Sequence, residues 1–391
     1  MLTLIKGGHV YSPQNLGQKD VLLGGTKILA IADGIDAPAG IETKIVDATG
    51  MNVIPGYVDG HVHILGAGGG HGPQSRSREV DITDLTKAGI TTVVGTLGIN
   101  CVSFHNRHLL AALNSLEIYG LTAYMYTGSY SLPSVTLMDT VLNDLANIEK
   151  VIGVALALYD TVSAYPTLET MKQLAHQAWL GSRLGFKAGV LHAHLGEADG
   201  NIAEICEMLV KMGLPPSIMM PTHVNRSEKV LGMSIEGGLA GASLDITGLN
   251  TPDFGLEEAV SPAAAFKRML AAGIPLKRIT MSSDGNGVQP FKNERGEVDR
   301  FVSTPIDAIA QEIKKAVWRD NIALEDILPI STINPAKTLR ISDKKGSVEA
   351  GKDADVVLLD QNLDVDTVFA KGKLMLESKK PTVVCIIEKP E

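Results

Sequence analysis

Residues 56–66 read GYVDGHVHILG, a short apolar run that ends in two histidines and a glycine. This is the first of eight strand-like runs that alternate with longer amphipathic stretches. We predict the strands at 56–63, 91–95, 122–127, 152–158, 189–194, 217–223, 242–246 and 278–283, and helices at 138–147, 167–183, 201–212, 256–272 and 304–319. Eight strands with interposed helices over about 250 residues are typical of a (β/α)₈ TIM barrel, an α/β fold.

Both ends of the chain differ from this central part. The first fifty residues and the residues after Leu339 form short apolar runs separated by Gly, Asp and Asn, without helix-length segments. This pattern is typical of antiparallel strands joined by hairpins. We therefore predict one small β-sandwich domain built from both chain termini, residues 1–54 and 343–391, with the barrel inserted as residues 55–342.

The composition limits the class of protein. Hydrophobic residues make up 45% and charged residues 20% of the 391 residues, as in ordinary globular proteins. A net charge of -9 argues against nucleic acid or an anionic membrane as a partner and favours a small-molecule substrate. The three cysteines have no CxxC spacing, and the N-terminus does not resemble a signal peptide. We therefore expect a cytoplasmic protein.

Residues able to bind a metal end several of the predicted strands. His61 and His63 alternate on one strand and so face the same side, toward the barrel mouth. His194 and His223 end two further strands, and Asp284 follows the last strand. Active sites of TIM barrels lie at this end of the strands. A divalent ion lowers the pKa of a bound water to about 7, and a carboxylate such as Asp284 can take its proton. The pattern predicts a metal-dependent hydrolase.

The order of these residues resembles that of the amidohydrolase superfamily. Within it, the chain is similar to bacterial isoaspartyl (β-aspartyl) dipeptidases over its whole length, in the strings HVHILG from His61, TGSY ending at Tyr130, PTHVNR ending at Arg226, and SSDGNG from Ser282. The resemblance implies metal ligation by His61, His63, His194, His223 and Asp284. It also implies that Asp284 is the proton shuttle, that Tyr130 polarises the scissile carbonyl, that Arg226 binds a substrate carboxylate, and that the protein is a homo-oligomer.

Four positions depart from that family. Ala155 stands where the family has a carboxylated lysine that bridges two zinc ions, and Gly70 stands where a glutamate meets the substrate amino group. Val162 and Val288 replace a second arginine and a serine. All four changes fall at the metal or the substrate. We therefore expect an altered substrate pocket, which includes Arg226, Gly70 and Val288, and in which His71 of the glycine-rich loop is a further candidate contact.

Three functions remain open at this point. The first is hydrolysis of an amide bond in a small amino-acid derivative or dipeptide. The second is a mononuclear amidohydrolase or deaminase acting on a cyclic amide or an amidine, to which Ala155 and the short HxxE motif of His194 and Glu197 point. The third is a non-catalytic homologue. The expected cofactor is a divalent metal, with zinc favoured, at one or two ions per chain. His192 is interpreted as a core histidine rather than a ligand.

Overall fold

The computed structural model describes residues 2–293 and 295–385. Its central sheet has eight parallel strands in chain order. They are β6 (Tyr57–Val62), β7 (Ile90–Gly95), β8 (Thr122–Gly128), β9 (Val151–Leu158), β10 (Val190–Leu195), β11 (Met219–Thr222), β12 (Leu244–Thr247) and β13 (Ile279–Ser282). All eight predicted strands are confirmed, and the predicted α/β barrel class with them.

The barrel is nearly closed between its first and last strands. The backbone N–H of His63 donates a hydrogen bond of 2.9 Å to the carbonyl of Gly285, next to a parallel bridge between Val62 and Gly285. Beneath it, the buried Asp59 carboxylate accepts hydrogen bonds from the backbone N–H (3.1 Å) and the hydroxyl (2.5 Å) of Ser283. A buried carboxylate is costly unless it is hydrogen-bonded. The closing seam is therefore held by a specific polar contact.

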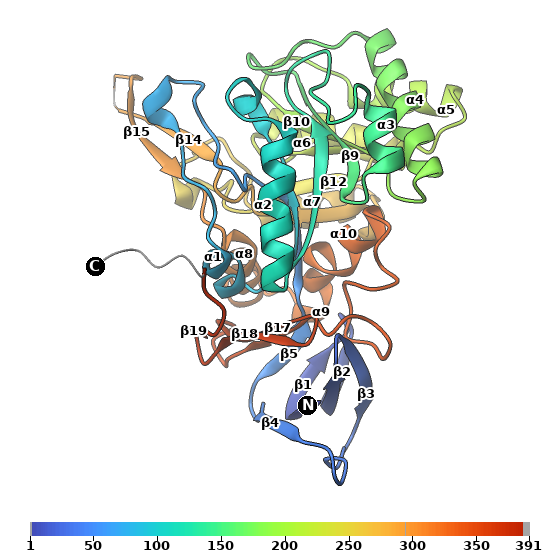
Figure 1. Ribbon diagram of the computed structural model, residues 1–391. Helices are drawn as coiled ribbons and strands as arrows, with labels where there is room; N and C mark the ends of the chain where they lie inside the picture. The colour runs from blue at the N-terminus through green and yellow to red at the C-terminus, as the bar shows by residue number, and fades with distance from the viewer. Residues whose placement is uncertain (1, 294, 386–391) are drawn as a thin grey trace.

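Helices surround the barrel (Figure 1). They are α1 (Ile82–Lys87), α2 (Asn106–Tyr119), α3 (Val141–Asn147), α4 (Leu168–Leu184), α5 (Ile202–Lys211), α6 (Glu228–Leu239), α7 (Pro262–Ala271), α8 (Ala308–Trp318), α9 (Leu324–Ile327) and α10 (Ile333–Thr338). Short 3₁₀ helices are η1 (Pro73–Ser75), η2 (Gly98–Val102), η3 (Pro216–Ile218), η4 (Pro252–Phe254), η5 (Leu276–Arg278) and η6 (Leu328–Ser331).

Capping residues decide where the helices begin. Thr167 and Asn201 accept hydrogen bonds from the backbone N–H groups of Thr170 and Glu204, and helices α4 and α5 start directly after them, as predicted. The helix predicted at 256–272 begins only at Pro262, because Ser261 is its N-cap and Pro262 its first residue. The sequence before this cap forms turns and loop, so that prediction was too long at its N-terminal end.

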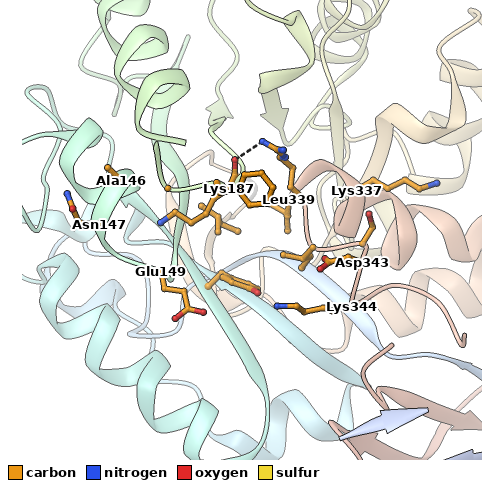
Figure 2. Close-up of a pocket in the computed structure, with 15 residues that line it drawn as sticks. Ala146, Asn147, Glu149, Lys187, Lys337, Leu339, Asp343 and Lys344 are labelled. Atoms are coloured by element: carbon orange, nitrogen blue, oxygen red, sulfur yellow. Dashed lines mark hydrogen bonds between the residues drawn. The ribbon is translucent and has the colours of Figure 1, made fainter. Parts of the chain in front are cut away.

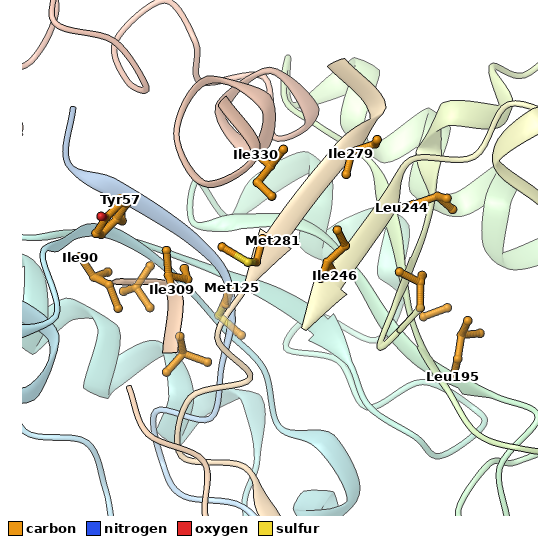
Figure 3. Packing of buried hydrophobic residues seen from close by; sticks show 14 of the residues in the cluster. Tyr57, Ile90, Met125, Leu195, Leu244, Ile246, Ile279, Met281, Ile309 and Ile330 are labelled. Atoms are coloured by element: carbon orange, nitrogen blue, oxygen red, sulfur yellow. The ribbon is translucent and has the colours of Figure 1, made fainter. Parts of the chain in front are cut away.

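The core lies between the barrel and the helices around it. Every residue of β7 and β9 is buried, as expected for parallel strands covered on both faces. Figure 3 shows apolar side chains of this cluster, with Ile246 and Met281 from the strands near Ile309 of α8 and Ile330 of η6. This packing fixes the strand ends that carry the candidate site.

The two ends of the chain, predicted to form one small β-sandwich domain, meet in one nine-stranded sheet (Figure 1). Its strands are β1 (Leu2–Tyr11), β2 (Asn15–Gly24), β3 (Lys27–Ala32), β4 (Thr43–Asp47), β5 (Asn52–Pro55), β16 (Val356–Leu359), β17 (Val365–Ala370), β18 (Lys373–Glu377) and β19 (Lys380–Pro381). Strand β5 pairs antiparallel with β16 and joins the two ends. The exact domain limits, 1–54 with 343–391 and 55–342, stay a prediction.

One element was not predicted. Strands β14 (Val288–Lys292) and β15 (Val298–Ser303) form an antiparallel hairpin between β13 and α8. Its strands carry few buried residues, so the apolar alternation that marks the other strands is weak here. Among the described residues, no helix combines the length and apolar character needed to cross a bilayer.

Candidate functional site

Three metal-binding atoms meet at the closing seam of the barrel. The Nε2 atoms of His61 and His63 are 3.4 Å apart, and they lie 3.5 and 3.2 Å from Oδ1 of Asp284. A tetrahedral ion with ligands at about 2.1 Å holds those ligands about 3.4 Å from one another. Within residues 2–293 and 295–385, this is the one His, Cys, Asp and Glu group with the spacing of a metal site. The three residues fit a divalent ion.

The protonation states at this group also suit a metal. Burial lowers the pKa of His61 well below its ordinary value, so its imidazole is neutral. Burial alone would raise the pKa of Asp284, but the hydrogen bond from His63 and the electrostatic interaction with the neighbouring imidazoles outweigh it and lower that pKa. Metal ligands must be neutral imidazoles and ionised carboxylates.

A further buried histidine supports the first ligand from below. Nε2 of His192 lies 3.0 Å from Nδ1 of His61, so one of these nitrogens donates to the other. The His192 ring stacks on Tyr126, with centroids 4.5 Å apart and planes 17° apart. Outer partners of this kind orient a ligating imidazole and fix its tautomer. His192 is a buried core histidine, as interpreted from the sequence, and it also contacts the candidate ligand His61.

The other two predicted ligands are held by protein groups. His194 has a partner on each ring nitrogen, with the Tyr130 hydroxyl 2.8 Å from Nδ1 and Oδ2 of Asp160 2.9 Å from Nε2. Nδ1 of His223 lies 2.8 Å from the Thr247 hydroxyl. Both rings adjoin the metal triangle, because His223 lies 5.4 Å from His61 and 4.6 Å from His194, measured between centroids. The structure brings all five predicted ligands together, but only three form a compact donor set.

A cavity of about 300 Å³ opens beside these residues. Its wall includes His63, His194, His223, Asp284, Tyr130, Arg226, Gly70, His71, Val162, Val288 and Ile99. Three of the four positions that depart from the family, Gly70, Val162 and Val288, thus lie in one cavity with Arg226. The fourth, Ala155, is buried inside the barrel, paired in register with His192 of the neighbouring strand.

Arg226 lies in the cavity wall with incomplete partners. Its Nη1 is 3.7 Å from Oδ2 of Asp160, and its buried Nε has no hydrogen-bond partner within the described part of the chain. The hydrogen bond with His194 lowers the pKa of the Asp160 carboxyl, which is therefore ionised. A guanidinium with free donors is suited to binding a carboxylate through paired hydrogen bonds.

Sequence reasoning missed several residues of this cavity, among them Asp160 and Ile99, and overestimated one. Asp160 belongs to no motif that the sequence analysis used, although its place two residues after β9 is a barrel-mouth position. Ile99 comes from η2, for which the sequence has no strand-end signal. Glu197 is exposed, does not line the cavity, and accepts a hydrogen bond of 2.7 Å from the Ser227 hydroxyl. A role for Glu197 as a general acid in this cavity has no structural support.

Known proteins match this chain at several levels. Residues 52–375 match the model of the amidohydrolase family. The crystal structure of a β-aspartyl dipeptidase from Fervidobacterium islandicum, in complex with a β-Asp-Leu dipeptide, is 31% identical, covers 99% of this chain and 100% of its own, and superposes with a TM-score of 0.88. A deacetylase of Agrobacterium fabrum is 25% identical over 376 residues, which are 95% of this chain and 86% of that protein.

A shorter match is higher in identity. A dihydroorotase of Streptococcus thermophilus is 39% identical over 97 residues, but this segment spans only 24% of this chain and about a fifth of that enzyme, 21%. It therefore carries no argument about the whole protein. The match to the family model covers most of the chain, and the β-aspartyl dipeptidase matches both the barrel and the terminal sheet. This chain therefore belongs to the amidohydrolase family.

Proposed function

We propose that this protein hydrolyses an amide bond in a small amino-acid derivative or dipeptide, in the manner of an isoaspartyl dipeptidase but with an altered substrate pocket. The observation that carries the proposal is the triangle of His61, His63 and Asp284 beside a cavity whose wall contains Arg226. A divalent ion, with zinc as the expected metal, would supply Lewis acidity and activate water at this place.

The chain supplies the proton transfer and part of the oxyanion stabilisation. Asp284 lines the cavity, so its carboxylate can take a proton from the attacking water and pass it to the leaving nitrogen. Tyr130 also lines the cavity, and burial raises the pKa of its phenol, which therefore stays protonated. When it turns from Nδ1 of His194, a protonated phenol can donate a hydrogen bond to the carbonyl oxygen as charge develops on it.

The donor set supports one ion per chain. The compact group has three members within the described residues, and Ala155 has no atom that could bridge to a second ion. Both ring nitrogens of His194 are already paired with Tyr130 and Asp160. A second ion would have to displace these contacts without gaining a bridge.

The cavity wall also supports a class of substrate. Arg226 is suited to one carboxylate of the substrate, while Ile99, Val162 and Val288 give the wall apolar surface. The two carboxylates that line the cavity, Asp160 and Asp284, are engaged with His194 and His63. No described carboxylate of the cavity is free to meet a substrate ammonium group. We infer an amide with one carboxylate and an apolar acyl group, such as an N-acyl amino acid, in preference to a dipeptide with a free amino group.

A second candidate function keeps the mononuclear site but changes the substrate. Ala155 also favours a mononuclear enzyme acting on a cyclic amide or an amidine. The products distinguish the two, because an amidine releases ammonia and a cyclic amide yields a single ring-opened product. An N-acyl amino acid instead yields a free amino acid and an acid.

The test is a substrate series on the metal-loaded protein and on two variants. The series pairs N-acetyl amino acids with their carboxamides and includes β-Asp-Leu. We expect hydrolysis of the free-carboxylate members, abolished by a chelator, and in Arg226→Met a rise in KM of at least about 30-fold, the loss expected when a buried charge partner is removed. Arg78→Met, at an exposed site of the mouth loop outside the cavity, is the control.

Two outcomes would overturn the proposal. If Arg226→Met and Arg78→Met behave alike on carboxylate substrates, Arg226 does not bind the substrate. If the metal-loaded wild-type protein hydrolyses no member of the series and no cyclic amide or amidine, the non-catalytic reading takes its place.

A further inference from the structure

A second large cavity lies at the opposite end of the barrel from the candidate metal site (Figure 2). It measures about 820 Å³ and is walled by the first residues of β8 and β9, the loops before β9 and β10, and the segment after α10. Four of its side chains are cations: Lys187, Lys337, Arg340 and Lys344. Small-molecule sites are commonly of about this size.

An adjoining cavity continues the same surface. It measures about 830 Å³, shares Lys187, Lys337 and Arg340 with the first, and adds Arg183, Lys277 and Arg278. We call the two together the basal groove. Seven cations line the basal groove, against the two carboxylates of Glu149 and Asp343. The lining of the groove is therefore net positive, whereas the whole chain has a net charge of -9.

These cations lack acidic partners. Within the described residues, none of the seven takes part in an ion pair, although many lysines and arginines elsewhere in the chain do. Glu149 and Asp343 are exposed and form no ion pair with them. The groove therefore holds positive charge that no described group neutralises at short range.

Several of the cations are held in place by neutral groups. Lys187 donates a hydrogen bond of 2.5 Å to the carbonyl of Ile148, and Arg340 donates one of 3.2 Å to the carbonyl of Lys187, the dashed line in Figure 2. Arg278 donates a hydrogen bond of 2.8 Å to the carbonyl of Gly238. Anchored side chains lose less conformational entropy when they bind a ligand.

Helix ends explain part of this charge. Cations near helix C-termini are favoured because each terminus carries about half a negative charge, and α3, α4, α6 and α10 end at the basal groove. Those termini and the two carboxylates still leave an excess of about three positive charges. An anion from outside the chain would neutralise this remaining positive charge.

The groove also presents an aromatic ring. Phe186 is 86% exposed, with the Arg340 guanidinium 5.6 Å from its ring centroid. Phe186 and Arg340 both have positive φ, 52° and 54°, on facing loops. Each follows the last turn of a helix, α4 or α10, where a left-handed residue commonly ends the helix. Burial lowers the pKa of Lys187 to about 8, so its charge would gain from a nearby anion.

We propose that the basal groove binds a small molecule that carries two or more phosphate groups. Phosphates accept hydrogen bonds from several cations at once, and lysine and arginine are the side chains that bind them. The exposed Phe186 ring offers a surface on which a planar group of the same ligand can stack. This site is separate from the candidate metal centre, and its failure would leave the proposed hydrolase unaffected.

The experiment is calorimetric titration of the full-length protein with tripolyphosphate and with ADP, at physiological ionic strength. Lys337→Gln/Arg340→Gln removes two groove cations. The matched control, Arg107→Gln/Lys380→Gln, removes one arginine and one lysine that are exposed and lie outside the groove. We expect saturable binding to the wild type and to the control, and affinity at least about tenfold weaker in the groove variant. Thermal melts of the unliganded variants check that both are folded.

Phe186→Leu tests whether the ligand has a planar group that stacks on this ring, in addition to its phosphates. If a ring stacks there, the variant weakens ADP binding and leaves tripolyphosphate binding unchanged. If it changes neither, the ligand is a phosphate chain alone, and the cation part of the proposal stands. No saturable binding of either probe to the wild type, or equal affinity in the groove variant and its control, would overturn the proposal.

Discussion

At the residue scale, the candidate metal centre is a set of three donor atoms from the two strands that close the barrel. The sequence predicted that His61 and His63 lie side by side, because two alternate positions on one strand share a face, and their Nε2 atoms are 3.4 Å apart. It predicted the nearness of Asp284 because all strand ends meet at one mouth. The sequence could not predict which histidine nitrogens already have a protein partner and which are left to bind an ion. The partners of His194, Tyr130 and Asp160, come from two other strand ends, and only the folded chain decides those distances.

His192 tests this local account. His192→Phe keeps a ring that can stack on Tyr126 but removes the nitrogen that contacts Nδ1 of His61. We expect metal affinity to fall about 10–100-fold, as when the outer partner of a metal ligand is lost. Competition with a chromogenic chelator measures it.

Tyr126→Phe is the matched control for His192→Phe. The Tyr126 hydroxyl is buried and has no partner among the described residues, so its removal should leave metal affinity unchanged. A His192→Phe protein that holds metal as tightly as Tyr126→Phe would show that this contact does not position His61.

At the scale of elements, apolar runs were enough to locate all eight barrel strands, because strands buried on both faces are continuous in hydrophobicity. Helix starts were predicted correctly where a cap precedes the apolar pattern, as at Thr167 and Asn201. The hairpin of β14 and β15 was missed because its described residues are all partly or fully exposed, so no apolar alternation marks its strands. Its residue Val288 nevertheless lines the cavity, so part of the substrate wall belongs to an element that burial patterns do not reveal.

The seam between β6 and β13 gives a second prediction. Ser283→Ala removes the hydroxyl donor of the buried Asp59 carboxylate. We expect the free energy of unfolding in urea to fall by about 1–3 kcal/mol, the cost of a buried group left without a partner.

Ser234→Ala is the comparison for the seam variant. Ser234 is fully buried and its hydroxyl has no partner in the described chain, so we expect a change within about 0.5 kcal/mol. Equal stability of the two variants would mean that the Ser283 hydroxyl does not hold the seam.

At the scale of the whole molecule, the sequence predicted that the two ends of the chain come together in one small β domain, and the pairing of β5 with β16 joins them in one sheet. The basal groove could not be predicted. Its seven cations are spread between residues 183 and 344 and share no motif, so only the fold collects them. The same holds for the cavity wall, where Ile99 of η2, Val162 of the loop after β9 and Val288 of β14 meet.

Global stability should depend on the titration of Asp245. This buried carboxylate accepts hydrogen bonds from the hydroxyls of Thr222, Thr280 and Ser282 and so links three strands. Burial nevertheless raises the pKa of Asp245 to about 6, whereas an exposed aspartate has a pKa of about 3.9. The folded protein holds this proton more tightly than the unfolded chain does. The resulting stabilisation is complete below about pH 4 and is lost as the pH rises through about 6.

The Asp245→Asn variant has no ionisable group at this position. It should therefore not show the loss of stability that the wild type shows as the pH rises through about 6. The unfolding free energy of the wild type, minus that of the variant, should fall by about 3 kcal/mol between about pH 4 and about pH 7. Urea titrations at both pH values measure it, and the difference cancels the pH dependence of the metal site, which both proteins share. A difference that does not change with pH would mean that Asp245 is ionised throughout.

The most direct test of the central claim is the metal content of the purified protein, measured by elemental analysis beside a His61→Ala/His63→Ala variant. The account predicts close to one divalent ion per chain in the wild type, none in the double variant, and loss of hydrolysis together with the ion. A wild-type protein that takes up no ion, or a double variant that keeps its ion, would contradict a metal site built on His61, His63 and Asp284. Two ions per chain would contradict the single-ion site.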